Sequence, residues 1–201
     1  MLRAENLAAF RGERLVFRDL SFSVAAGGAL VLAGPNGSGK STLLRVLAGL
    51  GRAAAGLLSW DGRDALADLT AHAERVAFVG HLDAVKPGLT VAENLAFHAQ
   101  LLGVSPAMTL PDALAALALT DLADLPARML SAGQKRRLAL SRLALTAAPL
   151  WLLDEPTLGL DTGAIARFGV LLRAHRDRGG IVIAATHVPL PLDDVAALHL
   201  A

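Results

Sequence analysis

The chain contains 201 residues, of which 54% are hydrophobic and 18% are charged, so it can bury the core of one sizeable domain and is not intrinsically disordered. Nineteen Lys and Arg residues against 18 Asp and Glu residues leave a net charge of +1, which is not the basic excess of a nucleic-acid-binding protein. The absence of cysteine excludes disulfides, iron–sulfur clusters, zinc–thiolate sites and thiol nucleophiles.

The first predicted elements are an antiparallel strand pair turned around Gly12, because Arg14–Val24 alternates between apolar and polar side chains. Four later segments are short apolar runs without such alternation, which is typical of strands buried on both faces of a parallel sheet. They are Ala29–Ala33, Val76–Val79, Leu150–Leu153 and Ile181–Ala185. Trp60-Asp61-Gly62 predicts a turn. We therefore expect an α/β fold in which a parallel sheet carries an antiparallel edge.

A glycine-rich segment follows the first of these apolar runs. It has the spacing GxxxxGKS between a predicted strand and a predicted helix, which is the setting of a phosphate-binding loop. The glycines let backbone N–H groups approach phosphate oxygens, and the helix start adds partial positive charge. We expect Lys40 to reach the β- and γ-phosphates of ATP and Ser41 to ligate Mg²⁺. The predicted nucleotide-binding residues are Gly34, Pro35, Asn36, Gly37, Ser38, Gly39, Lys40, Ser41 and Thr42.

Helical periodicity predicts several helices, and no convincing strand lies between residues 88 and 148. The helices are expected at Gly39–Leu50, Val91–Leu102, Pro111–Leu119, Gly133–Ala147 and Thr162–Arg178. We interpret residues 1–201 as one domain, with an α/β core of residues 1–87 and 149–201 and a helical subdomain of residues 88–148. Residues 94–111 are the longest stretch without Asp, Glu, Lys or Arg, but their polar side chains and two prolines argue against a membrane-spanning helix.

Two adjacent acids, Asp154 and Glu155, follow the apolar run Leu150–Leu153. Ligands of parallel sheets bind at the carboxyl ends of the strands, so both carboxylates are expected to face the phosphates. Asp154 suits the Mg²⁺ shell, together with Ser41. Glu155 is placed to orient and polarise the attacking water, which makes it the predicted catalytic base.

Three further segments match one family. Leu130-Ser131-Ala132-Gly133-Gln134 opens a predicted helix, Thr157–Asp161 follows the acid pair, and Thr186-His187 ends the last predicted strand. In this order and spacing the chain resembles the ATP-binding cassette (ABC) ATPases of membrane transporters over essentially its full length. The first of these segments resembles the family's signature sequence, with Ala132 in place of its first glycine.

The resemblance implies a phosphate-loop NTPase core of the RecA-like type, with an antiparallel edge and a helical subdomain. It also implies that two cassettes pack head to tail, each ATP lying between the phosphate loop of one chain and the signature of the other. We therefore expect a homodimer, or pairing with a homologous chain, in which Leu130, Ser131, Ala132, Gly133 and Gln134 act on the partner's ATP. His187 is expected beside the γ-phosphate and Glu155 as a second catalytic residue. Asp161 is expected to bridge the dimer interface.

Two positions depart from the family pattern. His81 stands where the family usually has a glutamine that senses Mg²⁺ and water, and an imidazole responds to pH as an amide does not. Arg11 stands where an aromatic residue commonly stacks on adenine, with Phe10 beside it. Either the guanidinium stacks on the base, or Phe10 does, or the contact is weak.

Within the family, the chain resembles the haem-exporter ATP-binding subunits of bacterial cytochrome c maturation. Gly80-His81, Lys86 and Glu93-Asn94-Leu95 carry this resemblance, together with the segments around Leu130 and Leu150. It implies a peripheral protein on the cytoplasmic face of the bacterial inner membrane, bound to integral membrane subunits that handle haem. Apolar residues of 85–102 are expected to form the groove for a membrane-subunit helix.

Nothing in the sequence indicates a direct haem ligand, since the six histidines form no close pair. An exporter of lipids or drugs is the main alternative, because the ATP chemistry would be the same with another cargo. A soluble ATPase acting on nucleic acid or ribosomes is a weaker alternative, since such relatives normally carry tandem cassettes or long coiled-coil insertions and a basic surface. No nucleic-acid partner is expected.

Overall fold

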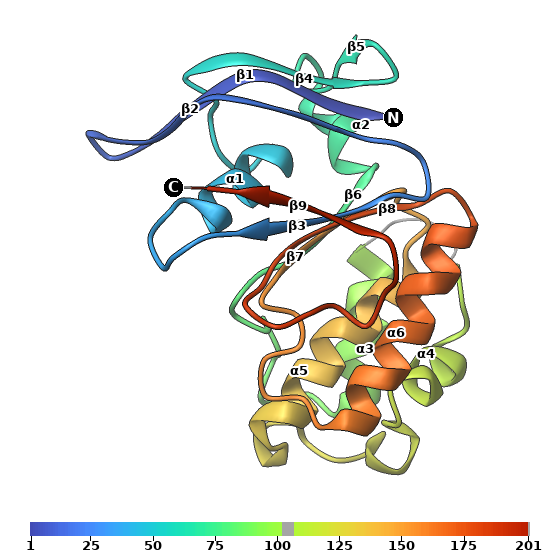
Figure 1. Cartoon of the computed structure of the whole chain (residues 1–201). Helices are drawn as coiled ribbons and strands as arrows, with labels where there is room; N and C mark the ends of the chain where they lie inside the picture. The colour runs from blue at the N-terminus through green and yellow to red at the C-terminus, as the bar shows by residue number, and fades with distance from the viewer. Residues whose placement is uncertain (102–106, 201) are drawn as a thin grey trace.

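The computed structural model describes residues 1–101 and 107–200, which form two sheets and a set of helices (Figure 1). The larger sheet is parallel, with the strand order β6-β7-β8-β3-β9. Its strands are β3 (Ala29–Ala33), β6 (Val76–Val79), β7 (Leu150–Asp154), β8 (Ile181–Ala185) and β9 (Val195–His199). The α/β fold with a parallel sheet is thereby confirmed.

The smaller sheet is antiparallel, with the order β2-β1-β4-β5. Its strands are β1 (Leu2–Arg11), β2 (Arg14–Val24), β4 (Ala55–Trp60) and β5 (Arg63–Asp64). The turn between β1 and β2 contains Gly12 at φ 62°, and Asp61 and Gly62 between β4 and β5 have φ of 49° and 79°. Positive φ at both central residues, as in Asp61-Gly62, or at a first glycine, as in Gly12-Glu13, is what the two favoured two-residue hairpin turns require. Both predicted turns are confirmed.

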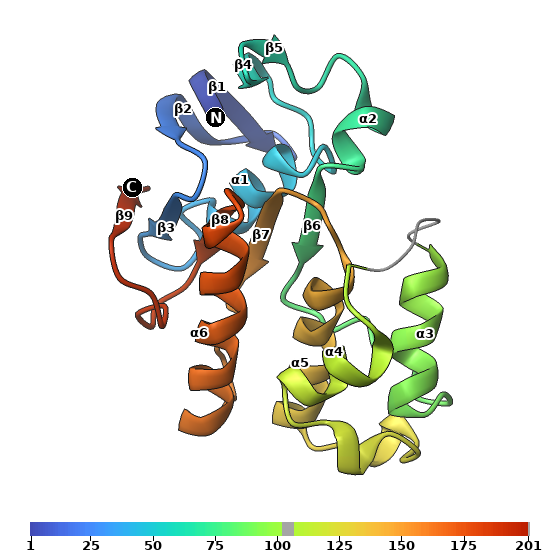
Figure 2. The same ribbon diagram turned by 90° about the vertical axis from the view of Figure 1, so that its right-hand side faces the viewer.

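The helices are distributed on two sides of the parallel sheet. α1 (Lys40–Leu47) lies between the two sheets, whereas α3 (Val91–Leu101), α4 (Leu110–Ala116), α5 (Ala132–Ser141) and α6 (Thr162–Asp177) lie on the other side (Figures 1 and 2). A short α2 (Leu69–Ala73) precedes β6. Three 3₁₀ turns complete the helical part, at Thr120–Leu122, Ala127–Met129 and Arg142–Leu145.

The predicted helices agree with these elements except near their ends. The expected helix Gly133–Ala147 divides into α5 and the last 3₁₀ turn. Leu102, the expected last residue of the Val91 helix, lies outside the described residues. Between β6 and β7 the described residues contain helices and one isolated bridge, Thr90 to Pro126. The subdomain boundaries at residues 88 and 148 remain a prediction.

Alternating side chains of the parallel strands build two separate cores. On β7, Leu150 and Leu152 pack into the core beneath the antiparallel sheet and α1, while Trp151 and Leu153 pack into the core of the helical side. All of these side chains are buried, which explains why the strand reads as an uninterrupted apolar run. The sheet is therefore fixed from both sides, and the residues that follow its strands are held at one rim.

β9 was not among the predicted strands. It pairs only with β3, at the edge of the sheet, and three of its five residues are exposed. Val195–Leu198 is an apolar run as long as that of β6, so the sequence carried a signal for this strand that the prediction did not use. Within the described residues, no helix combines the length and the apolar character that a membrane span requires.

Candidate functional site

The segment between β3 and α1 forms a loop that depends on glycine. Gly34, Gly37 and Gly39 have φ of 142°, 86° and 101°, which side chains of other residues rarely allow. Gly39 is the N-cap of α1 and makes no side-chain capping bond. The first N–H groups of a helix lack intrahelical acceptors, so they are available to an anion at this loop.

Two buried polar groups of this loop are arranged for a ligand. Lys40 is only 7% exposed, and its Nζ donates to the backbone oxygens of Gly34 and Pro35 at 2.7 and 2.9 Å. The Ser38 hydroxyl is buried without a hydrogen-bond partner among the described residues. A buried ammonium held by neutral carbonyls, beside a hydroxyl without a partner, suits a bound phosphate group.

The end of β7 lies across a cavity of about 340 Å³ from this loop. Asp154 and Glu155 line the cavity together with Lys40, Ser41 and His187. A serine hydroxyl and one carboxylate fit Mg²⁺, which is usually held by one or two carboxylates, waters and substrate phosphates rather than by a full protein cage. Accordingly, the described residues contain no cluster of three or more His, Cys, Asp or Glu side chains that would hold a metal by itself.

Glu155, His187 and Asn36 form a short chain of polar groups at the cavity. His187 Nε2 lies 2.9 Å from Asn36 Oδ1 and 3.5 Å from Glu155 Oε1. Because both neighbours are oxygens, a proton on Nε2 would have an acceptor on either side. Glu155 has φ of 47°, and its backbone N–H donates to the Ala185 oxygen of β8 at 2.8 Å. The expected proximity of His187 and Glu155 is found, although neither role is tested by it.

The signature residues lie at the start of α5, in the helical part. Ser131 is the N-cap, and its hydroxyl accepts from the Gln134 N–H while Gln134 Oε1 accepts from the Ser131 N–H. This reciprocal capping box leaves the amides of Ala132 and Gly133 without an intrahelical acceptor. A Cβ on Gly133 would lie 2.7 Å from the Gly159 oxygen, so α5 packs closely on the loop that follows the acid pair.

Leu130 is buried next to this capping box, and Asp161 caps another helix. Asp161 Oδ1 accepts from the Ala164 N–H of α6 at 2.7 Å. α1 and the start of α5 belong to different parts of the molecule (Figures 1 and 2). Of the described residues, those that line the 340 Å³ cavity include none of the signature, so one chain does not bring its own signature to its own phosphate loop.

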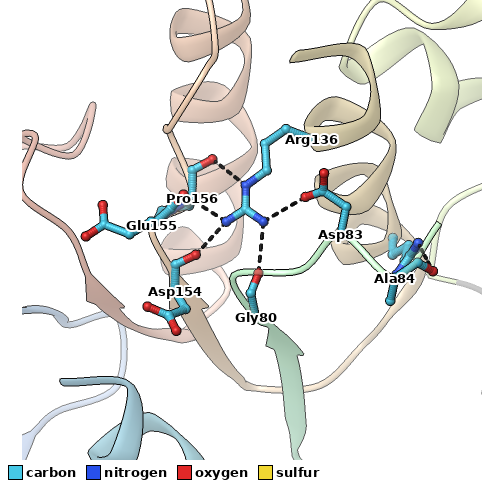
Figure 3. Close-up of polar contacts among 8 residues, drawn as sticks. Gly80, Asp83, Ala84, Arg136, Asp154, Glu155 and Pro156 are labelled. Atoms are coloured by element: carbon cyan, nitrogen blue, oxygen red, sulfur yellow. Dashed lines mark hydrogen bonds and ion pairs between the residues drawn. The ribbon is translucent and has the colours of Figure 1, made fainter. Parts of the chain in front are cut away.

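Sequence reasoning gave no role to Arg136, which links the signature helix to the acid pair (Figure 3). Its guanidinium donates to the backbone oxygens of Asp154, Glu155 and Pro156, to the Gly80 oxygen and to the Asp83 carboxylate. Main-chain acceptors leave no pattern in a sequence, so the only available signal was an arginine two residues after Gln134.

A second cavity of about 540 Å³ lies next to the first and shares Ser41, His81 and Asp154 with it. Its lining comes mainly from residues 76–84 and 142–146, with His98 of α3 and Arg45 of α1. Burial, and secondly the positive charge of Arg142, lower the pKa of His98, so this imidazole is neutral at pH 7. His81 is the predicted sensor residue that faces both cavities.

Arg11, Arg14 and Val16 of β1 and β2 also line the 340 Å³ cavity, so this is the part where adenine is expected. Phe10, in contrast, is 52% exposed and is not among the described residues that line it. Of the alternatives for adenine, the geometry therefore favours the Arg11 guanidinium. Two further histidines are structural: His72 is buried against the Leu47 oxygen, and His175 stacks on Trp151.

Residues 17–158 match the family described as ABC transporter. The chain belongs to this family. Similar curated proteins bear the name cytochrome c biogenesis ATP-binding export protein CcmA. That of Paramagnetospirillum magneticum is 52% identical over 98% of this chain and 92% of its own length. That of Gluconobacter oxydans is 51% identical over 100% of this chain and 87% of its own length.

Solved structures of the ABC transporter family agree with the fold. One is an ATP-binding subunit of an ABC transporter, with a TM-score of 0.82 and 26% identity over 93% of this chain and 80% of that one. Another is an ATP-binding cassette in a dimeric post-hydrolysis state with ADP and phosphate, with a TM-score of 0.80 and 25% identity over 94% of this chain and 88% of that one. The chain is therefore an ABC ATPase that binds and hydrolyses nucleotide, and dimeric relatives support its pairing as a dimer.

Proposed function

We propose that the chain is the ATP-hydrolysing subunit of a haem export complex in c-type cytochrome biogenesis. The observation that carries this proposal is identity of about half of all positions, over nearly the whole chain, with proteins named cytochrome c biogenesis ATP-binding export protein CcmA. The chain would work peripherally at the cytoplasmic face of the membrane, bound to integral membrane subunits. The nucleotide chemistry below stands whichever cargo is moved.

ATP would occupy the 340 Å³ cavity with its phosphates in the loop of residues 34–41. Lys40 would exchange the carbonyls that now hold it for phosphate oxygens, while Ser38 would gain the partner that it lacks. Ser41 and Asp154 would hold Mg²⁺, which neutralises charge on the β- and γ-phosphates when bound. Arg11 would cover the adenine.

Hydrolysis needs a water held in line with the γ-phosphate. Glu155 is the group that would accept a hydrogen bond from this water and later its proton. His187, with Nε2 protonated, would donate toward the γ-phosphate and keep the Glu155 carboxylate in place. Asn36 Oδ1 lies 2.9 Å from the same Nε2, so the His187 N–H would exchange Asn36 for the γ-phosphate when ATP binds.

The signature of a second copy would complete the site. The free amides of Ala132 and Gly133 and the Ser131 hydroxyl proton form an outward-facing group of donors at the start of α5. A head-to-tail homodimer brings these donors to the ATP of the partner, which explains why the chain keeps them far from its own phosphate loop. Asp161 would lie at this interface, with Oδ1 already used within the chain.

The 540 Å³ cavity is the proposed seat of a membrane-subunit helix. Its wall combines apolar groups, such as Val79 and the 82% exposed Leu82, with Arg45 and Arg142. An apolar helix end that carries an acidic residue would satisfy both features. Among the described residues, this cavity is lined mainly by residues 76–84, and His98 alone comes from the segment 85–102 in which the groove was expected.

Replacement of Glu155 tests the hydrolytic role. Glu155→Gln keeps the size of the side chain but removes its basicity, so ATP binding should persist while turnover falls by roughly 10²- to 10⁴-fold. Nucleotide binding and phosphate release would be measured on the same preparations. Glu74→Gln, on the exposed end of α2, is the matched control. Turnover that is unchanged in Glu155→Gln would remove this residue from the reaction.

Co-purification tests the transport assignment. The tagged chain, extracted from native membranes with detergent, should carry small multi-span subunits that serve haem handling. Leu82→Glu should release these subunits while ATP binding persists, whereas Leu69→Glu, on exposed α2, should retain them. Capture of a lipid or drug permease would move the function to another exporter, and ribosomal or nucleic-acid partners would refute the transport class.

A further inference from the structure

Arg136 joins three parts of the chain through one side chain. It lies on α5 just beyond the signature residues and is only 5% exposed. A guanidinium has five N–H donors, and each of those in Arg136 has one acceptor. Nε donates to Pro156 O at 3.2 Å and Nη1 to Gly80 O at 2.9 Å and Asp83 Oδ1 at 3.0 Å, while Nη2 donates to the oxygens of Asp154 and Glu155.

Three of these acceptors are consecutive carbonyls at the end of β7. Glu155, the middle one, has the left-handed φ of 47°, which a residue with a Cβ keeps only when its surroundings enforce it. Its N–H is bound to Ala185 O at 2.8 Å and its oxygen accepts from Arg136 at 2.8 Å. Both peptide groups of Glu155 are thus held, and the direction of its side chain follows from them.

The other two acceptors belong to the loop after β6. Gly80 directly follows that strand, and Asp83 lines the 540 Å³ cavity. The same guanidinium therefore links α5, the helix that begins with the signature, to the cavity wall and to the end of β7 (Figure 3). Through these bonds, the main chain on both sides of the proposed catalytic base is connected to the cavity wall and to α5.

We propose that Arg136 is a positioning residue for ATP hydrolysis. It holds the Glu155 peptide in the left-handed conformation that aims the carboxylate at the water, as long as α5 and the loop of residues 80–83 keep their places. This inference rests on the proposed role of Glu155. Lysine cannot replace Arg136, since three donors on one nitrogen do not span acceptors spread over the plane of a guanidinium.

The test compares Arg136→Lys with Arg137→Lys in the full chain. Arg137 is a matched control because it lies next on α5 and also donates to main-chain oxygens, those of Leu117 and Ala118, of which Ala118 has φ of 53°. Its acceptors lie in the helical part, away from the nucleotide cavity. Arg136→Lys should lower kcat by roughly tenfold to a hundredfold, with KM and ATP affinity changed by no more than about twofold. Arg137→Lys should keep kcat within about twofold of the wild type.

Two further measurements separate positioning from loss of folded protein. The amount of ATP bound per chain counts the molecules with an intact phosphate loop, and kcat is expressed per bound ATP. In the Glu155→Gln background, Arg136→Lys should cause no further loss, because two residues that act through one step are not additive. A further loss of the same size would overturn the positioning role.

The outcomes distinguish the inference from the function on which it rests. If Glu155→Gln turns over like the wild type, the role of Glu155 falls and this inference falls with it. If Glu155→Gln is inactive and Arg136→Lys equals Arg137→Lys, only the role of Arg136 is refuted. Should Arg136→Lys lose ATP binding altogether, Asp83→Ala takes its place, since that side chain is partly exposed and supplies one acceptor. A severalfold lower kcat per bound ATP is then expected, and an unchanged kcat overturns the proposal.

Discussion

The starts of α1 and α5, which are both proposed to face a nucleotide, are built in opposite ways. α1 starts from a left-handed glycine without a side-chain cap, with a buried lysine behind it. α5 starts from Ser131 in a complete capping box on the surface. At the start of α1, the buried Ser38 hydroxyl has no hydrogen-bond partner among the described residues and Lys40 is held by backbone carbonyls, so a ligand would add hydrogen bonds there. At the start of α5, the capping box already supplies hydrogen bonds within the chain, and Ser131 is exposed. The difference shows how one chain supplies two unlike halves of a site that only a pair completes.

Mixing two inactive variants tests most directly whether the starts of α1 and α5 from different chains form one site. Lys40→Ala should lose nucleotide binding and Ser131→Arg should lose turnover while its monomer still binds ATP. In a mixed dimer, the intact loop of the Ser131→Arg chain meets the intact signature of the Lys40→Ala chain. Mixing equal amounts should therefore restore phosphate release to about a quarter of the wild-type rate, if one complete site works alone and chains pair at random.

Each variant alone, measured at the same total concentration, is the control for this experiment. No recovery in the mixture, with mixed dimers demonstrated by two different tags, would mean that phosphate loop and signature do not share an ATP. Recovery in either single variant would remove the need for one of the two segments.

Alanine at the two N-caps sharpens the comparison at the level of stability. Gly39→Ala places a Cβ at φ 101° and against the Val16 side chain, which should cost about 2–3 kcal/mol and abolish tight ATP binding. Ser131→Ala loses only its half of the capping box and should cost about 1 kcal/mol, without effect on binding by the monomer. Thermal unfolding and nucleotide titration of both variants measure this contrast. Equal losses of binding would contradict it.

The buried stack of Trp151 on His175 makes the stability of the whole fold depend on pH, and this affects both helix starts alike. Burial is the main cause that lowers the pKa of His175, to about 4 from the ordinary 6.5. Between these values the unfolded chain binds a proton that the folded chain does not, so the free energy of unfolding falls as pH falls from about 6.5 to about 4 and levels off below. The total loss should be about 3 kcal/mol.

Urea unfolding at several pH values measures this loss, and both helix starts should lose their function together as the shared β7 strand unfolds. His175→Phe should remove the corresponding part of the pH dependence. The exposed His199→Gln should leave it unchanged. A His175→Phe profile that is as steep as the wild type would show that other groups cause the acid sensitivity.

The sequence predicted best those features that are encoded in consecutive residues. Four strands of the parallel sheet were visible because both of their faces are buried, and the phosphate loop because its glycines and lysine have a fixed spacing. β9 was missed although Val195–Leu198 is an apolar run, since two of its four residues are alanine, which favours strands weakly. Arg11 was named as one of several alternatives, and only the placement of β1 and β2 favoured it over Phe10.

Contacts that join distant parts of the chain were not predictable. The bond between His187 and Asn36 was missed although both residues were named, because it depends on the relative placement of β8 and the phosphate loop. The cavity proposed for a membrane helix was expected on residues 85–102 and is lined mainly by residues 76–84. The course of the loop after β6 decides which of its residues line the cavity, and apolar periodicity does not predict the course of a loop.

The acceptors of Arg136 have a consequence for the evolution of this chain. Four of the five are main-chain oxygens, and Asp83 is the only side chain among them. Substitution at the other four positions changes a side chain but leaves the oxygen, so selection on Arg136 exerts no pressure for paired changes there. Covariation between columns of related sequences would therefore be blind to this contact, except at residue 83.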